Sequence, residues 1–148
     1  MIRHITRTLL FAALVFLPLS AMAADHDRVV ENVFIILSSQ SPQTQGMAMV
    51  LANTIADEGA TVDVLLCDAA GDMALAQGDG GPQLAPRGFT PGKLLGALVE
   101  KGASVSVCAL YLPNSVYTET DLAEGVAVAK PPEMTALMRD PKVRVFTF

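Results

Sequence analysis

The order of strand-like and helix-like segments is the feature of this sequence that most restricts its fold. From residue 33 to residue 148, continuous apolar runs of strand length alternate with segments whose apolar residues recur at helical spacing. Strands that are apolar on both faces are typical of a parallel sheet covered by helices on both sides. The sequence therefore predicts a three-layer α/β fold with a mainly parallel sheet of four or five strands.

The expected elements can be placed from their caps and apolar periods. Ser41-Pro42 and Thr90-Pro91 each combine a capping hydroxyl with proline at the first helical position, so helices are expected to start there. Glycines at 59 and 102 are expected to stop them. A short helical turn should follow the second strand, and a loop rich in glycine and proline should occupy residues 77–89. The expected strands cover residues 33–37, 61–67, 104–108 and 143–148, and the four helices begin near residues 41, 90, 118 and 132.

Apolar periodicity also predicts which sides of two helices face the core. The first helix is expected to bury one face, and the last helix is expected to turn three apolar residues inward. For the first helix these residues are Met47, Val50, Leu51, Thr54 and Ile55; for the last they are Met134, Leu137 and Met138.

The first 23 residues have the pattern of a secretory signal peptide. Two arginines precede a short apolar run over residues 9–17, and Ala21-Met22-Ala23 forms a cleavage signal. The apolar run is too short for a membrane-spanning helix, and no second one follows. We expect a mature chain of residues 24–148 that forms a single domain in the periplasm, with no membrane span.

Charge and histidine content exclude several classes of function. Two of the ten basic residues precede residue 24 and all 15 acidic residues follow it, so the mature chain has a net charge of −7. Such a chain is a poor partner for nucleic acid or anionic membranes. His26 is the only histidine after the signal, which argues against Ser-His-Asp and Cys-His catalysis and most zinc enzymes. Three acids near the second strand have the pattern of solvated loop residues: Asp63, Asp68 and Asp72.

Two cysteines end two of the expected strands, Cys67 the second and Cys108 the third. The carboxyl ends of parallel strands are where α/β proteins hold their reactive groups. Adjacent strands lie about 4.8 Å apart, so the thiols have the reach to form a disulfide or share a soft metal ion. The alternative is two unrelated buried cysteines. Each thiol is expected on the more polar side of its strand, with Thr61, Asp63, Ser104 and Ser106.

A second candidate site depends on signal cleavage. Cleavage after residue 23 exposes Ala24-Asp25-His26, which combines a free amine, two amides and an imidazole at the third position. This arrangement binds Cu(II) or Ni(II) in a square plane of four nitrogens; a histidine without a metal role is the alternative. A soft-metal site elsewhere would use two thiols and one thioether, from Cys67, Cys108 and Met73.

Four segments together resemble the DsrE/DsrF-like sulfur-relay family. They are SSQS at 38–41, VSVC at 105–108, ETDLAEG at 119–125 and VRVFTF at 143–148. The resemblance implies the DsrE-like fold over nearly all of the mature chain. It also implies that Cys108 accepts sulfur as a persulfide and that the chain forms a homo-oligomer.

These observations support three hypotheses of function. The first is a periplasmic sulfur carrier or thiol relay in which Cys108 reacts, Cys67 is a partner, and the sulfur comes from small sulfur species or a partner thiol protein. The second is a periplasmic copper or soft-metal protein using both cysteines and the mature N-terminus. The third is a non-catalytic assembly domain. A carrier or binding protein is favoured over a turnover enzyme.

The candidate N-terminal copper site can be tested by moving the amine. The square-planar chelate uses the α-amine of Ala24, so one added residue at the front is expected to abolish Cu(II) binding while His26 stays in place. The measurement is copper stoichiometry and the visible absorption band. It is made in a Cys67→Ser, Cys108→Ser background, because thiols reduce Cu(II). Identical spectra for the extended and native termini would refute the assignment.

Overall fold

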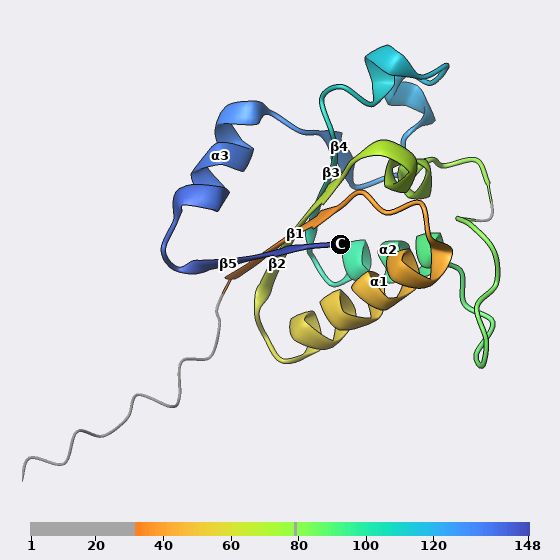
Figure 1. Ribbon diagram of the computed structural model, residues 1–148, viewed down its shortest axis with the longest axis horizontal. Coiled ribbons are helices and arrows are strands. Elements are labelled where there is room, and N and C mark those ends of the chain that lie inside the picture. Colours follow the sequence, from red (N-terminus) through yellow and green to blue (C-terminus); the bar gives the residue numbers. More distant parts are fainter. Residues whose placement is uncertain (1–31, 79) are drawn as a thin grey trace, which may run out of the picture.

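The computed structural model describes residues 32–78 and 80–148. Within them, five strands form one sheet in which every neighbouring pair is parallel, in the order β4-β3-β2-β1-β5 (Figure 1). The strands are β1 (Asn32–Leu37), β2 (Thr61–Leu66), β3 (Ser104–Val107), β4 (Val126–Val128) and β5 (Val143–Thr147). The predicted parallel sheet is confirmed.

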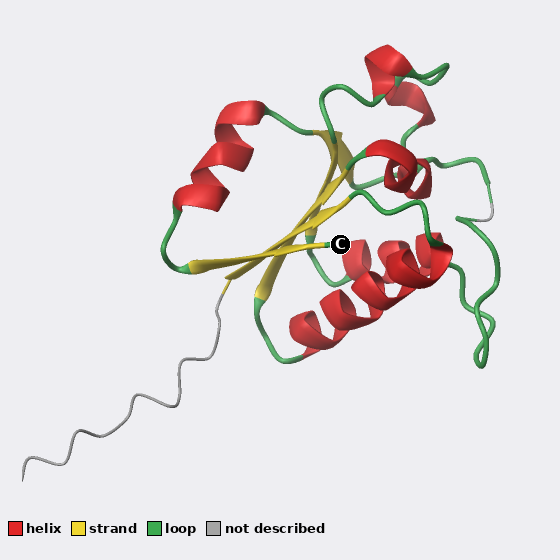
Figure 2. Cartoon of the chain, in the orientation of Figure 1, coloured by secondary structure: helices red, strands yellow, loops and turns green. Residues whose placement is uncertain are grey.

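Helices cover both faces of this sheet (Figure 2). The chain steps from β1 to β2 to β3 in one direction, and the helices on that path, α1 and α2, pack against each other on one face. From β4 the chain returns in the opposite direction to β5, so a right-handed crossover places α3 on the other face. The helices are α1 (Pro42–Asp57), α2 (Pro91–Glu100) and α3 (Pro131–Arg139). This is the predicted three-layer architecture.

The predicted helix starts are confirmed by their caps. The Ser41 side chain accepts a hydrogen bond from the Thr44 amide at 3.4 Å, and the Thr90 side chain accepts one from the Lys93 amide at 3.2 Å. Past the end of α1, Gly59 has φ of 92°, a left-handed conformation that favours glycine. These caps satisfy amides that the first turn leaves without partners.

The hydrophobic core lies between the sheet and the pair α1 and α2. Strand alternation sends the side chains of every second residue to this side, and the register aligns them in rows across the sheet. One row contains Ile35, Val64 and Val105, each at most 2% exposed. Close packing of these rows fixes where the neighbouring strands end.

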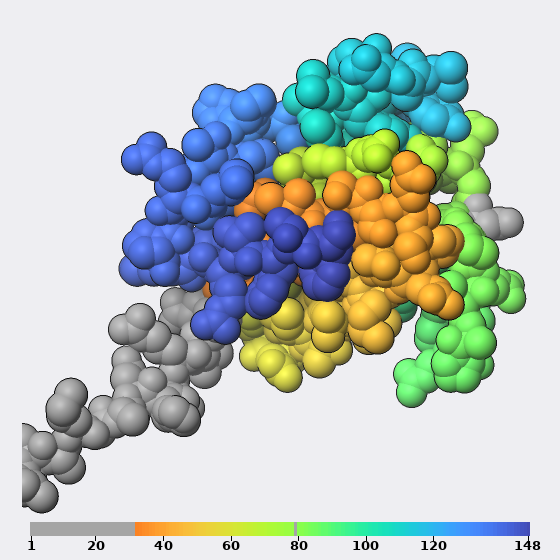
Figure 3. Space-filling view, viewed as in Figure 1, coloured from red at the N-terminus to blue at the C-terminus, as the bar shows by residue number. Residues whose placement is uncertain are grey.

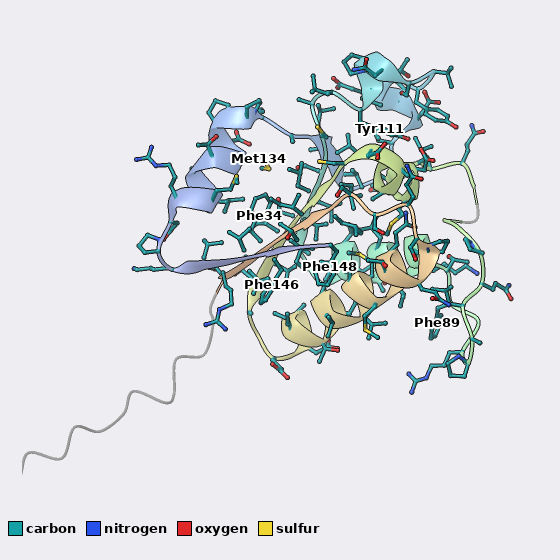
Figure 4. All side chains as sticks on the ribbon, in the orientation of Figure 1. Phe34, Phe89, Tyr111, Met134, Phe146 and Phe148 are labelled. Atoms are coloured by element: carbon teal, nitrogen blue, oxygen red, sulfur yellow. The ribbon has the colours of Figure 1, made fainter. Side chains whose placement is uncertain are left out.

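The opposite side of the sheet is more polar. Phe34 of β1 is fully buried there, in the space between the sheet and α3 into which Met134 points (Figure 4). Its register partner on β2 is Asp63, which pairs in turn with Ser104 on β3. Burial raises the pKa of Asp63, and a hydrogen bond with Ser104 acts in the opposite direction. The predicted polar side of β2 and β3 is therefore present.

Of the predicted inner face of α1, Ile55 packs against the core, whereas Thr54 is exposed and the three larger predicted residues before it are wrong. Met47, Val50 and Leu51 are 56%, 44% and 43% exposed. The buried face instead carries small residues and one methionine, namely Gly46, Ala48, Met49 and Ala52. Small residues let α1 approach the sheet closely, a preference that a search for large apolar residues does not detect.

The predicted helix near Thr118 is also wrong. The Thr118 hydroxyl and the Asp121 carboxylate form a capping box, but it closes only a single 3₁₀ turn, Glu119–Asp121. The chain then extends, because Leu122 forms an antiparallel bridge with Leu75 and the Ala123 amide donates to the Ala74 carbonyl at 2.8 Å. Tertiary pairing therefore overrides the local helix signal, and the chain enters β4, the strand that the sequence did not locate.

Two further differences concern the last helix and strand. Met138, expected inward, is 57% exposed, whereas Met134 and Leu137 are half-buried. The last strand lies at the surface, beside the β1 to α1 segment, and its Phe146 is partly exposed (Figure 3). The sheet edge at β5 is thus less covered than its centre.

The predicted signal peptide and the Ala24-Asp25-His26 terminus lie outside the described residues. Among the residues that are described, no helix combines the length and apolarity that crossing a membrane requires.

The corrected orientation of α1 predicts a contrast between two neighbouring positions. Met49→Ala removes a side chain that is 0% exposed and is expected to lower the free energy of unfolding by about 2–5 kcal/mol. Leu51→Ala, on the exposed face, is expected to change it by less than about 0.5 kcal/mol. Urea denaturation of both variants measures this difference. An equal or larger loss for Leu51→Ala would contradict the orientation, and repeating the curves at several protein concentrations would reveal whether a second copy covers that face.

Candidate functional site

Both cysteines lie one residue beyond the ends of neighbouring strands. The last register pair of β2 and β3 is Leu66 with Val107, and parallel pairing continues past it. The Cys108 amide donates to the Leu66 carbonyl at 2.8 Å, and the Cys67 amide donates to the Leu37 carbonyl at 2.8 Å. The sheet ladder itself therefore places the two thiols side by side.

The two thiols interact directly. Both cysteines are half-buried and are not joined in a disulfide. The pKa of Cys67 is raised to about 11, first by burial, then by the charge of Cys108 and by the hydrogen bond that Cys67 donates to it, and last by the Asp68 carboxylate. At neutral pH Cys67 therefore holds its proton and presents an S–H donor to Cys108.

The chain turns sharply after Cys67. Asp68 has φ of 50°, and Asp is among the few residues other than glycine that adopt this left-handed conformation at modest cost. The turn leads into a 3₁₀ helix, η1 (Asp68–Ala74), whose first backbone bond runs from the Ala70 amide to the Cys67 carbonyl at 3.1 Å. This confirms the predicted helical turn and directs the chain away from the thiol.

The segment after Cys108 is held by its own hydrogen bonds. The Tyr111 amide donates to the Cys108 carbonyl at 2.8 Å, and the Asn114 carboxamide donates to the Leu110 carbonyl at 2.8 Å. The next turn is a short 3₁₀ helix, η2 (Leu112–Asn114). This segment forms one wall above the thiol.

Tyr111 ties this wall to η1. Its hydroxyl donates to Asp72 Oδ1 at 2.5 Å, and its ring lies over Gly71, where a Cβ would collide with the ring carbons. Burial raises the pKa of Tyr111, and the hydrogen bond to Asp72 and the charge of that carboxylate raise it further. Tyr111 stays a neutral phenol, and Figure 4 shows it beneath the turns that follow β3.

The two segments enclose an open cavity of about 490 Å³ onto which Cys108 faces. Cys67 does not line it, so Cys108 is the outer thiol and Cys67 the inner one. The lining residues are Asp68, Ala69, Asp72, Cys108, Leu110, Tyr111, Asn114 and Ser115. The arrangement suits attack by Cys108 on a small sulfur compound in the cavity.

The other predicted ligands are not gathered here. Met73 is 6% exposed in the hydrophobic core and does not line the Cys108 cavity, while Ala24, Asp25 and His26 are outside the described residues. Over residues 32–78 and 80–148, no three or more His, Cys, Asp and Glu side chains are grouped so as to hold a metal ion. Within that part of the chain, the metal candidates reduce to the thiol pair.

Sequence reasoning missed the Tyr111 and Asp72 pair. Asp72 has the pattern of a solvated loop acid, and Tyr111 that of an ordinary loop residue. Their contact joins residues far apart in the chain, so no local pattern shows it. The sequence signal available for this pair was the position of each residue, because Asp72 and Tyr111 both follow soon after a cysteine that ends a strand.

Comparison with known proteins supports the fold. No protein-family model and no curated protein matches the sequence. The structure is similar to that of the ychN protein from E. coli, with a TM-score of 0.63 and 17% identity over 80% of this chain and 99% of that one. It is also similar to MTH1491 from Methanobacterium thermoautotrophicum, a protein of unknown function, with a TM-score of 0.61 and 15% identity over 79% and 98% of the two chains. The chain therefore has the expected DsrE-like fold, and at these identities the likeness concerns the fold alone.

The inner and outer positions predict which thiol reacts first. At pH 8 only about one in a thousand Cys67 thiols is ionised, given its pKa of about 11, and thiolates are the nucleophiles. One equivalent of iodoacetamide on the reduced, folded protein is therefore expected to label Cys108, as located by peptide mass mapping. Cys67→Ser should keep the label and Cys108→Ser should lose most of it. Preferential labelling of Cys67 in the unmodified chain would contradict the arrangement.

Proposed function

We propose that this protein carries sulfur, with Cys108 as the thiol that accepts it as a persulfide. The observation that carries the proposal is the thiol of Cys108 facing a cavity at the carboxyl end of β3, beside a second thiol that keeps its proton. Since the fold alone does not assign an activity, the argument rests on this local chemistry.

The transfer needs no oxidant. The Cys108 thiolate attacks the outer sulfur of a donor persulfide, R–S–SH, forming a new S–S bond to Cys108 as the S–S bond of the donor breaks. The products are the Cys108 persulfide and the donor thiolate R–S⁻. The reverse exchange passes the sulfur to an acceptor thiol, so the protein acts as a carrier rather than a turnover enzyme.

Cys67 has a defined role in this scheme. Because it keeps its proton at neutral pH, Cys67 does not compete with Cys108 for the donor sulfur. If Cys67 ionised, its thiolate could attack Cys108 Sγ, form the Cys67–Cys108 disulfide and expel the extra sulfur as HS⁻. The raised pKa of Cys67 disfavours that loss at neutral pH.

The setting of this function follows from the sequence. Residues 1–23 have the pattern of a secretory signal, and we propose that the carrier works in the periplasm on small sulfur species or a partner thiol protein. Self-association is also part of the proposal. Self-association is supported by exposed apolar side chains on α1, namely Met47, Val50 and Leu51, and by Phe89 in the loop that precedes α2.

A second candidate function uses the same thiols. Two adjacent cysteine sulfurs suit a soft ion such as Cu(I), which thiolates select. In this case Cys67 must lose its proton to the metal, so binding would release protons. Copper storage or delivery in the periplasm is therefore the rival to sulfur transfer.

Sulfur loading separates the two candidates. Reduced, metal-free protein treated with cysteamine persulfide under argon is expected to gain the mass of one sulfur atom, because Cys108 accepts it. Cys67→Ser should still load, because the accepting thiol is unchanged, and Cys108→Ser should not load. Intact mass spectrometry and peptide mapping provide the measurement.

The contradicting results are specific. Sulfur retained in Cys108→Ser and lost in Cys67→Ser would refute the assignment of the carrier thiol. Stoichiometric copper in protein purified from the periplasm, lost in either cysteine variant, together with no sulfur loading of the metal-free chain, would favour the metal-binding function.

A further inference from the structure

The cavity in front of Cys108 carries negative charge without a compensating cation. Asp68 and Asp72 both line it and both are exposed. No lysine or arginine of residues 32–78 and 80–148 lines it. Any molecule that occupies the cavity in front of Cys108 therefore lies close to two carboxylates.

One of the two carboxylates is fixed by a hydrogen bond, and the other lies next to Cys67. Asp72 accepts the Tyr111 hydroxyl at 2.5 Å, which fixes it on the side of η1. Asp68 directly follows Cys67, and its charge contributes to the raised pKa of that thiol. Its field thus reaches the sulfur atoms.

Two lysines near the edges of the sheet are paired with carboxylates away from the cavity. Lys130 follows β4, the strand beside β3, but its Nζ pairs with Glu133 Oε1 at 3.0 Å and it does not line the cavity. Lys101, which follows α2 at the opposite edge of the sheet, pairs with Asp57 Oδ1 at 2.8 Å. Among the described residues, therefore, the lining of the cavity supplies no cation that would attract an anion to Cys108.

The negative charge of the cavity discriminates between sulfur compounds that differ in their own charge. The Cys108 thiolate reacts with its donor in a cavity that is also lined by two carboxylates. An anionic donor is therefore repelled by the thiolate and by both carboxylates. A cationic donor is attracted by the same groups, and an uncharged donor is unaffected. Fields focused in a cleft change association rates by about 10-fold or more at low ionic strength.

We propose that the Cys108 cavity selects its partners by charge, reacting with persulfide and disulfide compounds that are cationic or uncharged and excluding anionic ones. The inference deepens the proposed function and rests on Cys108 as the reacting thiol. Asp68 and Asp72 are then the residues that determine specificity.

Three small symmetrical disulfides test the selection without any sulfur transfer. They are cystamine, bis(2-hydroxyethyl) disulfide and 3,3′-dithiodipropionate, which are cationic, uncharged and anionic. Each reacts by the same exchange, in which the Cys108 thiolate bonds to one probe sulfur and the other half leaves as a thiolate. Rate constants are measured by intact mass in the full chain carrying Cys67→Ser and are divided by those of free N-acetylcysteine amide.

The expected result is a cationic-to-anionic rate ratio at least about 10-fold above that of the free thiol at low salt. The ratio should shrink as salt is added, because the carboxylates are exposed and therefore screened. In Asp68→Asn, Asp72→Asn the ratio should fall to near that of the free thiol. Asparagine keeps an acceptor for Tyr111 and tolerates the left-handed turn at 68, so the fold of the wall is preserved.

A matched control separates the local effect from the net charge of the protein. Glu58 and Glu100 are both exposed. Glu58 follows α1 and Glu100 ends α2, and at these two points the chain returns to the amino ends of β2 and β3. Both residues therefore lie at the far edge of the sheet from Cys108. Glu58→Gln, Glu100→Gln removes the same charge as the cavity variant and is expected to leave the ratio unchanged.

Two outcomes would overturn the inference alone: a ratio close to that of the free thiol, or an equal response to both double variants. Either result leaves persulfide loading of Cys108 as a separate question. Failure of Cys108 to react with all three probes, in protein whose circular dichroism matches the unmodified chain, would overturn this inference and the proposed function together. Normal probe selectivity with no persulfide loading would remove only the sulfur-carrier function.

Discussion

The parallel pairing between β2 and β3 is the interaction on which the site depends. It does not stop at the last strand residues, because the Cys108 amide still donates to the Leu66 carbonyl. Two thiols separated by 40 residues of chain are thereby held as neighbours by backbone bonds, independent of any side-chain packing. The buried rows beneath them, such as Ile35, Val64 and Val105, keep the strands from sliding, since a shift of one residue would turn the core side chains outward.

The pair is asymmetric although the two residues are chemically identical. Cys67 lies beside Cys108, keeps its proton and does not line the cavity, whereas Cys108 faces the cavity. Environment alone creates this division of roles, as burial and neighbouring charge do in other sites with two similar groups. The single histidine after residue 23, His26, lies outside the described residues, so the described site contains no imidazole.

The sequence was sufficient to predict the sheet, the capped helices α1 and α2, and the neighbouring cysteines, because these depend on local patterns and on the regular spacing of parallel strands. It failed where tertiary contact decides. The Thr118 capping box is real but closes only one turn, since Leu122 pairs with Leu75. The inner face of α1 was misassigned because close approach to the sheet favours Ala48 over the larger Leu51. The contact of Tyr111 with Asp72 joins two loops and has no periodic signature.

The packing of Tyr111 on Gly71 has a consequence for how this site can diverge. The ring fills the volume that any Cβ at position 71 would occupy, so the two positions share one space. A lineage that replaces Gly71 first must displace the ring, and with it the hydroxyl that holds Asp72. A lineage that first shrinks Tyr111 frees position 71 but releases the carboxylate from the cavity wall. The two residues can therefore drift only in a fixed order or as a pair, and the wall in front of Cys108 changes in discrete steps rather than gradually.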